Sequence, residues 1–330
     1  MIQIRNGHFI PHKNFAGDSL MKHIKQNSLI VVIFSFLVCC LSCGQKVPEF
    51  DGNRAFAYLT VQTDFGPRNP GSEGHKKCLD YLVAELKKYA DMVNTQPFVF
   101  NDTFTNQTFE LTNIIASFNL NPKNNQRILL LSHWDTRPRA EEDPDAAKRN
   151  TPISGANDGA SGVAVLLEIA SILKNNPPNI GVDILLVDGE DYGDSRVNDL
   201  DYYFLGSRYF TKTMGTYRPK FAILLDMVGS KNAQFYIEGY SNEYASDYAK
   251  QIWKKAETLG FKPFVSKIGP HISDDHWIFN QAGIPSVDII DINQYSINYV
   301  HWHTTADTPE QCSPATLAMV GTVVLHIIYE

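Results

Sequence analysis

The segments Arg127–Ser132 (RILLLS) and Val182–Val187 (VDILLV) decide the fold of this 330-residue chain. The first is a continuous apolar run bounded by polar residues and the second is apolar apart from Asp183, which is typical of a β-strand buried on both faces of a sheet. Phe221–Leu225 (FAILL) is a further strand of this kind, and Ile284–Ile290 (IPSVDII) is predicted to be another strand. Such strands belong to largely parallel sheets that helices cover on both sides.

Helical patterns alternate with these strands. Ala160–Leu173 is apolar almost all round and predicts a buried helix. Four further segments have helical spacing: Tyr81–Tyr89, Tyr202–Lys212, Glu243–Leu259 and Pro314–Ile328. The alternation predicts an α/β fold, a three-layer α/β/α sandwich around a central mixed, mostly parallel twisted sheet. In such sheets ligands bind at the carboxyl ends of the strands.

The N-terminal segment has the features of an export signal. Lys22 and Lys25 follow Met21, and the apolar run Leu29–Leu41 is too short for a comfortable membrane span. Cys43 follows in a context that resembles the lipobox of bacterial lipoproteins. We therefore expect residues 1–43 to be a signal segment. We also expect translation to start at Met21, so that residues 1–20 are not made. The protein should be exported to the periplasm and anchored there by a lipid on Cys43. A simple cleaved signal and a retained anchor helix are the alternatives.

Residues 44–330 contain no linker, repeat or shift in composition, so we expect a single catalytic domain. The composition, 43% apolar and 20% charged, is that of a soluble globular protein. The net charge of −7 argues against a nucleic-acid-binding surface. We expect a monomer that meets the membrane only through its N-terminal lipid. The sequence leaves open whether Cys78 and Cys312 pair, and it predicts a long surface loop at Arg137–Thr151.

Acidic and histidine residues collect where the predicted strands end. A lone Asp in such a place is more often a helix cap, and a lone His is more often structural. Here, however, six separate segments carry such residues, and burying many carboxylates together is costly unless a cation neutralises them. A set of His, Asp and Glu without Cys suits a catalytic zinc with one open position. The residues include His133, Asp135, Asp158, Glu190, Asp191, Asp226, Asp274 and His303.

These segments also occur as recognisable motifs. In order they are GPRNPGS (66–72), SHWD (132–135), SGANDGASG (154–162), DGED (188–191), LLDMVG (224–229), SDDHWIF (273–279) and WHTTADT (302–308). From about Phe56 to the C-terminus, their order and spacing resemble the zinc aminopeptidase-like superfamily. Within it the chain looks most like the glutaminyl cyclases, particularly the bacterial branch.

The resemblance implies a role for each matching residue. Asp158, Asp191 and His303 match the ligands of a single zinc per chain, although the animal-type cyclases carry Glu at the position of Asp191. Glu190 matches the general acid/base, and Asp226 and Asp274 match a proton network. Trp302 matches the aromatic wall of the substrate pocket. The implied reaction is the zinc-dependent cyclisation of N-terminal glutamine in peptides or proteins to pyroglutamate, with release of ammonia.

Two other functions compete with this one. Aminopeptidases of the same superfamily use two zinc ions, and His133 and Asp226 match the ligands of the second, with Asp158 as the bridge and Asp135 behind His133. The doubled Asp274-Asp275 and the aromatic Trp302 favour the cyclase. A binding lipoprotein that has kept the fold is the third reading. Metal stoichiometry separates the first two functions, and any turnover excludes the third.

Overall fold

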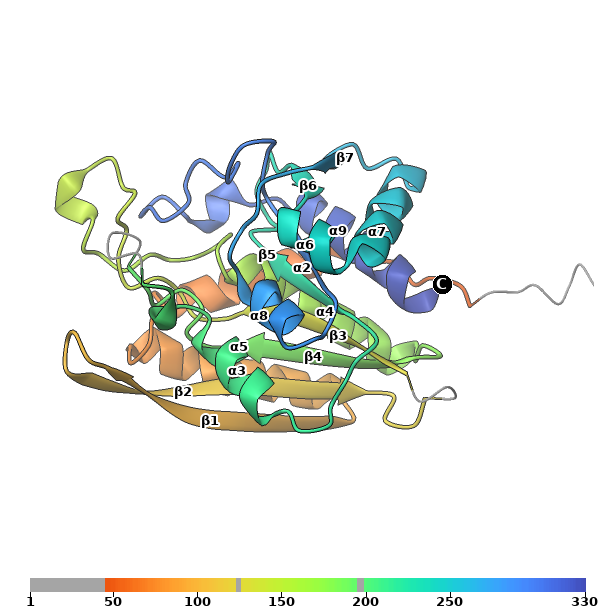
Figure 1. Cartoon of the computed structure of the whole chain (residues 1–330), viewed down its shortest axis with the longest axis horizontal. Coiled ribbons are helices and arrows are strands. Elements are labelled where there is room, and N and C mark those ends of the chain that lie inside the picture. Colours follow the sequence, from red (N-terminus) through yellow and green to blue (C-terminus); the bar gives the residue numbers. More distant parts are fainter. Residues whose placement is uncertain (1–44, 123–125, 195–198) are drawn as a thin grey trace, which may run out of the picture. The chain divides into compact units, whose positions relative to one another are not determined.

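The computed structural model describes residues 45–122, 126–194 and 199–330. Its largest sheet has six strands in the order β1-β2-β4-β3-β5-β8 (Figure 1). The four strands expected from the sequence are its parallel part: β3 (Arg127–His133), β4 (Gly181–Val187), β5 (Ala222–Asp226) and β8 (Ser286–Ile290). The prediction of an α/β fold around a mixed, mostly parallel sheet is confirmed.

Two antiparallel strands that the sequence analysis missed complete one side of this sheet. β1 (Met92–Asp102) pairs with β2 (Gln107–Phe118), and β2 pairs antiparallel with β4. β1 is an edge strand whose side chains are largely exposed or half-buried, so it lacks the apolar run that marks the inner strands. It contains Pro97, which an edge strand tolerates because the missing N–H would face outward.

Alternate residues of the inner strands enter two different cores, as the two-residue period of a strand requires. Ile128 and Leu130 pack into the larger core, whereas Leu129 and Leu131 pack into a smaller one on the opposite face. Figure 1 shows α5 and α8 in front of the sheet and α4 behind it. The larger core is covered by α2 (Gly52–Asp64), α3 (Glu73–Tyr89), α4 (Ala160–Asn175) and α9 (Pro314–Tyr329), and the smaller by α5 (Leu205–Thr213) and α8 (Asp275–Gln281).

Helix α4 lies unusually close to the end of β5, and Gly162 makes this approach possible. A Cβ at this position would lie 2.1 Å from the backbone oxygen of Leu225. The close contact brings the loop before α4 to the carboxyl ends of β3 and β5. The acidic residues of that loop and of the strand ends therefore meet.

The helix expected at Glu243–Leu259 is divided in the structure. It forms α6 (Gly239–Tyr244) and α7 (Ser246–Thr258), with the break at Ala245. A second, two-stranded parallel sheet, β6 (Phe235–Ile237) and β7 (Phe264–Ile268), packs nearby. Three short 3₁₀ helices complete the described elements: η1 (Ala146–Lys148), η2 (Leu200–Tyr202) and η3 (Pro309–Gln311).

Residues Val47–Glu330 form one compact unit. The expected signal segment, including Cys43, lies outside the described residues. Among the described helices, none is long and apolar enough to cross a membrane. Cys78 and Cys312 are both buried, and neither forms a disulfide.

The segment after β3 differs from the predicted surface loop. Its second half is exposed, but Arg137, Ala140, Glu141 and Asp143 are buried. The prediction of a surface loop was therefore wrong for the start of this segment. Its polar residues are used inside the protein.

Candidate metal centre and active site

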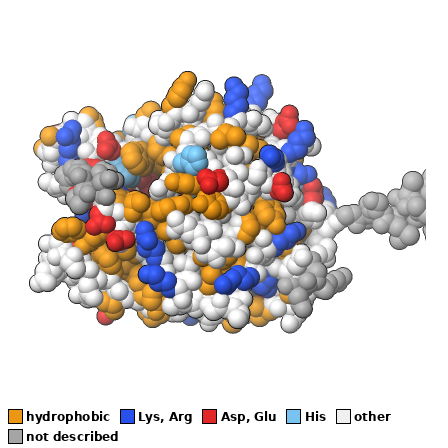
Figure 2. Space-filling view, in the orientation of Figure 1, with side chains coloured by type: hydrophobic (Ala, Val, Ile, Leu, Met, Phe, Trp, Pro, Cys, Tyr) orange, Lys and Arg blue, Asp and Glu red, His pale blue; other side chains and the backbone are white. Residues whose placement is uncertain are grey.

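A cavity of about 250 Å³ opens where the predicted strand ends meet. Figure 2 shows this region as a recess in which acidic and histidine side chains lie among apolar ones. Its polar lining consists of Asp158, Glu190, Asp191, Asp226, Ser273, Asp274 and His303. Its remaining walls are Leu200, Tyr203, Phe204, Met227, Ile272, Ile290, Ile297 and Trp302. Apart from His133 and Asp135, every site residue expected from the sequence lines this one cavity.

Asp158, Asp191 and His303 offer one ligand atom each within 4.8 Å of one another, and all three are buried. His303 Nε2 lies 3.8 Å from Asp158 Oδ2 and 3.6 Å from Asp191 Oδ1. Burial, together with the positive charges of Arg137 and His133, lowers the pKa of His303 well below its usual value. The imidazole is therefore neutral and has a lone pair to donate.

This trio fits a zinc ion. Asp191 Oδ2 is buried and has no hydrogen-bond partner among the described residues. Burial raises the pKa of Asp191 well above its usual value despite the nearby Arg137, so a cation at Oδ2 would stabilise its charged form. Carboxylate oxygens and a neutral imidazole nitrogen are among the ligands that zinc takes, and the cavity leaves room for a further one.

A second group lies directly beside the first. His133, Asp158 and Asp226 also offer ligand atoms within 4.8 Å of one another. His133 Nε2 is 3.3 Å from both Asp158 Oδ1 and Asp226 Oδ1, and its Nδ1 is 3.6 Å from Asp135. His133 itself is buried behind the cavity and is not among its lining residues.

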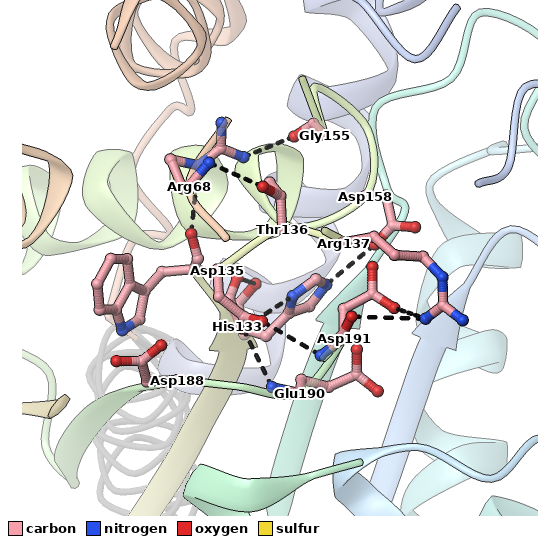
Figure 3. A network of polar contacts seen from close by, with 12 residues as sticks. Arg68, His133, Asp135, Thr136, Arg137, Gly155, Asp158, Asp188, Glu190 and Asp191 are labelled. Atoms are coloured by element: carbon pink, nitrogen blue, oxygen red, sulfur yellow. Dashed lines mark hydrogen bonds and ion pairs between the residues drawn. The ribbon is translucent and has the colours of Figure 1, made fainter. Parts of the chain in front are cut away.

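Asp135 holds the turn after β4 rather than facing the cavity. Its two carboxylate oxygens accept the backbone N–H groups of Glu190 (3.1 Å) and Asp191 (3.2 Å), as Figure 3 shows. Adjacent residues of one turn are thus fixed by one carboxylate. This explains how Glu190 and Asp191 keep their places at the end of β4.

Asp307 fixes the loop before α4 by accepting backbone N–H groups, as Asp135 fixes the turn after β4. Asp307 was not among the site residues predicted from the sequence. It accepts the backbone N–H groups of Asn157 (2.8 Å) and Asp158 (3.1 Å), and the hydroxyl of Tyr299 donates to it. The sequence feature that could have pointed to Asp307 is its place in the WHTTADT motif, four residues after His303. This motif therefore contains one metal-ligand candidate, His303, and the residue that fixes the backbone of another, Asp158.

Two further residues lock these loops together. The guanidinium of Arg68, from the GPRNPGS motif, is fully buried and donates to the backbone oxygens of Trp134 and Ser154. It also donates to the backbone oxygen of Gly155 (Figure 3). Gly159 has a φ of +95°, and a Cβ there would lie 2.8 Å from the Asp135 backbone oxygen. Both the left-handed backbone and the lack of space require glycine at this position.

Three carboxyl groups near the metal trio have raised pKa values. Burial and the neighbouring acidic charges raise the pKa of Glu190 well above its usual value, against the effect of His133. Burial also raises the pKa of Asp226. Burial and the charge of Asp226 raise the pKa of Asp274 to about 7. A group that exchanges protons near neutral pH suits general acid–base chemistry.

Behind Asp274 lies a second buried polar group. Asp274, His276 and Asp288 offer ligand atoms within 4.8 Å of one another. His276 Nε2 is 2.9 Å from Glu238 Oε2, and its Nδ1 is 3.6 Å from Asp288. Both carboxylate oxygens of Asp288 and of Asp275 lack hydrogen-bond partners among the described residues.

The walls of the cavity contain strained backbone. Phe204 (φ 59°), Met227 (φ 49°) and His303 (φ 54°) all have left-handed conformations, which bulky residues rarely adopt. All three line the cavity. Strain of this kind collects at functional sites. Beside them, the ring of Trp302 stacks on His303 with a centroid distance of 3.7 Å.

The fold and this arrangement of buried His and Asp residues define a zinc exopeptidase-like protein. Comparison with protein families gives the same result, because the model of Peptidase family M28 matches residues 113–328. The chain therefore belongs to Peptidase family M28, of the zinc aminopeptidase-like superfamily.

The known proteins that are similar to this chain include both glutaminyl cyclases and zinc-dependent peptidases. The glutaminyl cyclase of Bacteroides thetaiotaomicron is 39% identical, with a TM-score of 0.82 over 86% of this chain and 99% of that one. A Zn-dependent exopeptidase from Parabacteroides distasonis is 40% identical, also with a TM-score of 0.82, over 86% of this chain and 100% of that one. Aminopeptidase YwaD of Bacillus subtilis is 28% identical over 86% of this chain, which spans 58% of that protein's length. The expected resemblance to bacterial glutaminyl cyclases is confirmed.

Proposed function

We propose that this protein is a zinc-dependent glutaminyl-peptide cyclotransferase. Its substrates are peptides or proteins with N-terminal glutamine, which it converts to pyroglutamate with release of ammonia. The observation that carries the proposal is the lining of the cavity. Asp158, Asp191 and His303 all line it, whereas His133, which a second zinc would need, is buried and is not among its lining residues.

The size of the cavity supports the same reaction. About 250 Å³ is below the usual range for sites that enclose drug-sized ligands. Such a space suits one amino-acid residue held in a ring-like conformation, and this proximity supplies much of the catalysis of an intramolecular reaction. Trp302 and the apolar walls would exclude water from the folded side chain.

The chain's own carboxylates account for the proton transfers. The neutral α-amine of the substrate attacks its own γ-carbonyl carbon, a C–N bond forms, and the bond to the side-chain amide nitrogen breaks. Glu190 takes a proton from the attacking nitrogen and returns it to the leaving nitrogen, which departs as ammonia. Asp226 and Asp274 form a buried network of carboxyl groups that can exchange protons with Glu190. When bound by Asp158, Asp191 and His303, one zinc supplies a Lewis acid that polarises the γ-carbonyl.

One experiment separates this function from the alternatives. Purified protein is incubated with a peptide that begins with Gln and with matched peptides that begin with Ala or Leu. We expect a loss of ammonia from the first peptide only, with one zinc per chain by elemental analysis. A peptide with Gln in second position is the control, and it should remain unchanged.

A two-zinc aminopeptidase is the second candidate, because His133, Asp158 and Asp226 form a group able to hold another ion. Similarity to Aminopeptidase YwaD also favours it. Loss of the whole first residue from the Ala and Leu peptides, with two zinc ions per chain, would replace the cyclase by this enzyme. A lack of any turnover in the zinc-loaded protein would favour a binding protein.

We also propose that the protein acts as an exported monomer, in the periplasm and anchored by a lipid on Cys43. The proposal rests on the positive region, apolar run and Cys43 of the sequence. Mass spectrometry of the cellular protein should find a mature chain that starts at Cys43. Detection of Met1 or of an intact Leu29–Leu41 segment would contradict it.

A further inference from the structure

Arg137 is a buried guanidinium in direct contact with the metal-ligand candidate Asp191. Its side chain has no exposed surface. Nη1 donates to Asp191 Oδ1, and Figure 3 shows the guanidinium reaching the carboxylate. Oδ1 is thereby engaged, while Asp191 Oδ2 has no hydrogen bond among the described residues.

The position of Arg137 is set by two other residues. Its Nε lies 2.8 Å from both carboxylate oxygens of Glu141, and its Nη2 also donates to Glu141. Nη2 donates in addition to the hydroxyl of Tyr203 at 3.0 Å. A planar guanidinium held at Nε and Nη2 has a fixed orientation, so the direction of Nη1 toward Asp191 is fixed as well.

The charges of this group match those needed for a divalent cation. The negative charge of Glu141 balances the positive charge of Arg137. A guanidinium without Glu141 beside it would place an unbalanced positive charge next to the metal-ligand candidates and weaken the binding of a cation there.

We propose that Arg137, held by Glu141 and Tyr203, is a positioning residue that orients Asp191 for zinc and couples the metal site to the cavity wall. The proposal rests on the zinc site of the proposed function but not on the reaction. Asp191 is short, and the guanidinium removes its rotational freedom. Because Tyr203 lines the cavity, movement of Arg137 would reach the substrate-binding wall too.

The test compares zinc binding in Arg137→Met, the double variant Arg137→Met with Glu141→Leu, and Arg139→Met. The double variant removes both charges, so no buried Glu141 is left unpaired if the single variant folds poorly. Arg139 is the matched control, because it lies on the same segment but donates to the backbone oxygens of Tyr192 and Gly193. Zinc dissociation constants come from competition with a chromophoric chelator, and thermal melting of the zinc-free proteins reports on the fold.

We expect the zinc affinity of both Arg137 variants to fall about 10–100-fold, as for other residues that orient a ligand. The absorption spectrum of the Co²⁺-substituted protein should change with it. Arg137→Lys should recover part of the affinity, and Arg139→Met should bind zinc like the unaltered protein. An unchanged zinc affinity in a double variant that melts like the control would overturn the proposal. If the unaltered protein showed no cyclase activity, the proposed function would fail, but the differences in zinc affinity between the variants could still be measured. Failure of the proposed function and failure of the proposed role of Arg137 are therefore distinguishable.

Discussion

Two buried polar groups flank the cavity and compensate their charges in different ways. The metal-side cluster consists of Asp135, Arg137, Asp158, Asp191 and His303. In this cluster, Asp135 accepts two backbone N–H groups and Asp191 accepts a guanidinium. The proton-side cluster consists of Glu238, Asp274, Asp275, His276 and Asp288. Here both oxygens of Asp275 and of Asp288 lack hydrogen bonds among the described residues.

The difference shows which ion each cluster is suited to hold. On the metal side, fixed donors keep the carboxylates oriented and leave a site for a divalent cation. On the proton side, burial raises the pKa of Asp274 to about 7 and that of Asp275 to about 8. Groups with such pKa values exchange protons near neutral pH, which suits acid–base chemistry. Glu190 and Asp274 both line the cavity, so Glu190 lies where the two clusters meet.

The largest effect is expected from Glu190→Gln, which removes the acid–base group and keeps the shape of the side chain. The turnover number for Gln-initiated peptides should fall ~10²–10⁴-fold. The zinc content should stay unchanged, because the variant alters no member of the metal trio. Ammonia release and elemental analysis measure the two quantities.

Glu142→Gln is the matched control, because Glu142 is exposed and lies outside the cavity lining. Its turnover should equal that of the unaltered protein. If Glu190→Gln lost its zinc, Glu190 would belong to the metal-side cluster and the division drawn here would be wrong.

A large loss of stability is expected from His276→Leu. The imidazole is fully buried, with Nε2 2.9 Å from Glu238 Oε2 and Nδ1 3.6 Å from Asp288, and its removal leaves the buried Glu238 carboxylate without this hydrogen-bond partner. A buried acceptor left without its partner costs about 1–3 kcal/mol, and more when it is charged. Urea unfolding measures the change.

His271→Leu provides the comparison, since more than half of the His271 side chain is exposed. Its free energy of unfolding should change by no more than about 0.5 kcal/mol. Equal effects of the two substitutions would show that His276 does not compensate the proton-side cluster.

The sequence predicted the part of the fold that rests on apolar runs. The runs at 127–132 and 182–187 correspond to β3 and β4, because a strand buried on both faces is mostly apolar. β1 was missed because it is an edge strand whose side chains are largely exposed or half-buried, and the first four residues of β2 are likewise exposed or half-buried, so neither shows a clear apolar run from its start. The residues of the metal trio could be named because their motifs follow strand ends, where topology brings them together.

The supports of the site could not be predicted in this way. Arg137 and Glu141 lie in a polar stretch whose composition predicts a surface loop. The burial of Arg137 depends on contacts with Asp191 and Tyr203, which are more than fifty residues away along the chain. Only tertiary structure supplies such partners, so the candidate metal ligands could be named from the sequence, whereas Arg137, which contacts one of them, could not.

The pH dependence of stability should distinguish the proton-side cluster directly. An unfolded Asp ionises near pH 4, but burial and the charge of Asp274 raise the pKa of Asp275 to about 8 in the folded protein. Between these values the folded state binds the extra proton, so stability falls as pH rises and the loss is complete above pH 8. Asp275→Asn should make this slope shallower by up to about 1.4 kcal/mol per pH unit.

Urea unfolding of the zinc-free protein at pH 5, 6 and 7 measures the slope without a contribution from metal binding. Asp64→Asn, at an exposed position, should leave the slope unchanged. A slope in Asp275→Asn equal to that of the unaltered protein would mean that Asp275 holds no proton in the folded state.

The smallest effect is expected on the metal side, at the wall of the cavity. Trp302 stacks on His303 and lines the cavity, so Trp302→Leu removes apolar contact with the substrate but no charge. Losing part of a buried aromatic surface costs about 1.4 kcal/mol, which raises KM ~10-fold with a smaller change in kcat. Trp302→Phe retains a ring, so its KM should be close to that of the unaltered protein. Trp277→Leu, which alters a ring stacked on Tyr240, should leave KM unchanged.

Steady-state kinetics with a Gln-initiated peptide, together with the zinc dissociation constant of each variant, separates two explanations. A higher KM at constant zinc affinity assigns Trp302 to substrate binding, whereas a loss of zinc affinity would assign its ring to the orientation of His303 and remove it from the pocket wall.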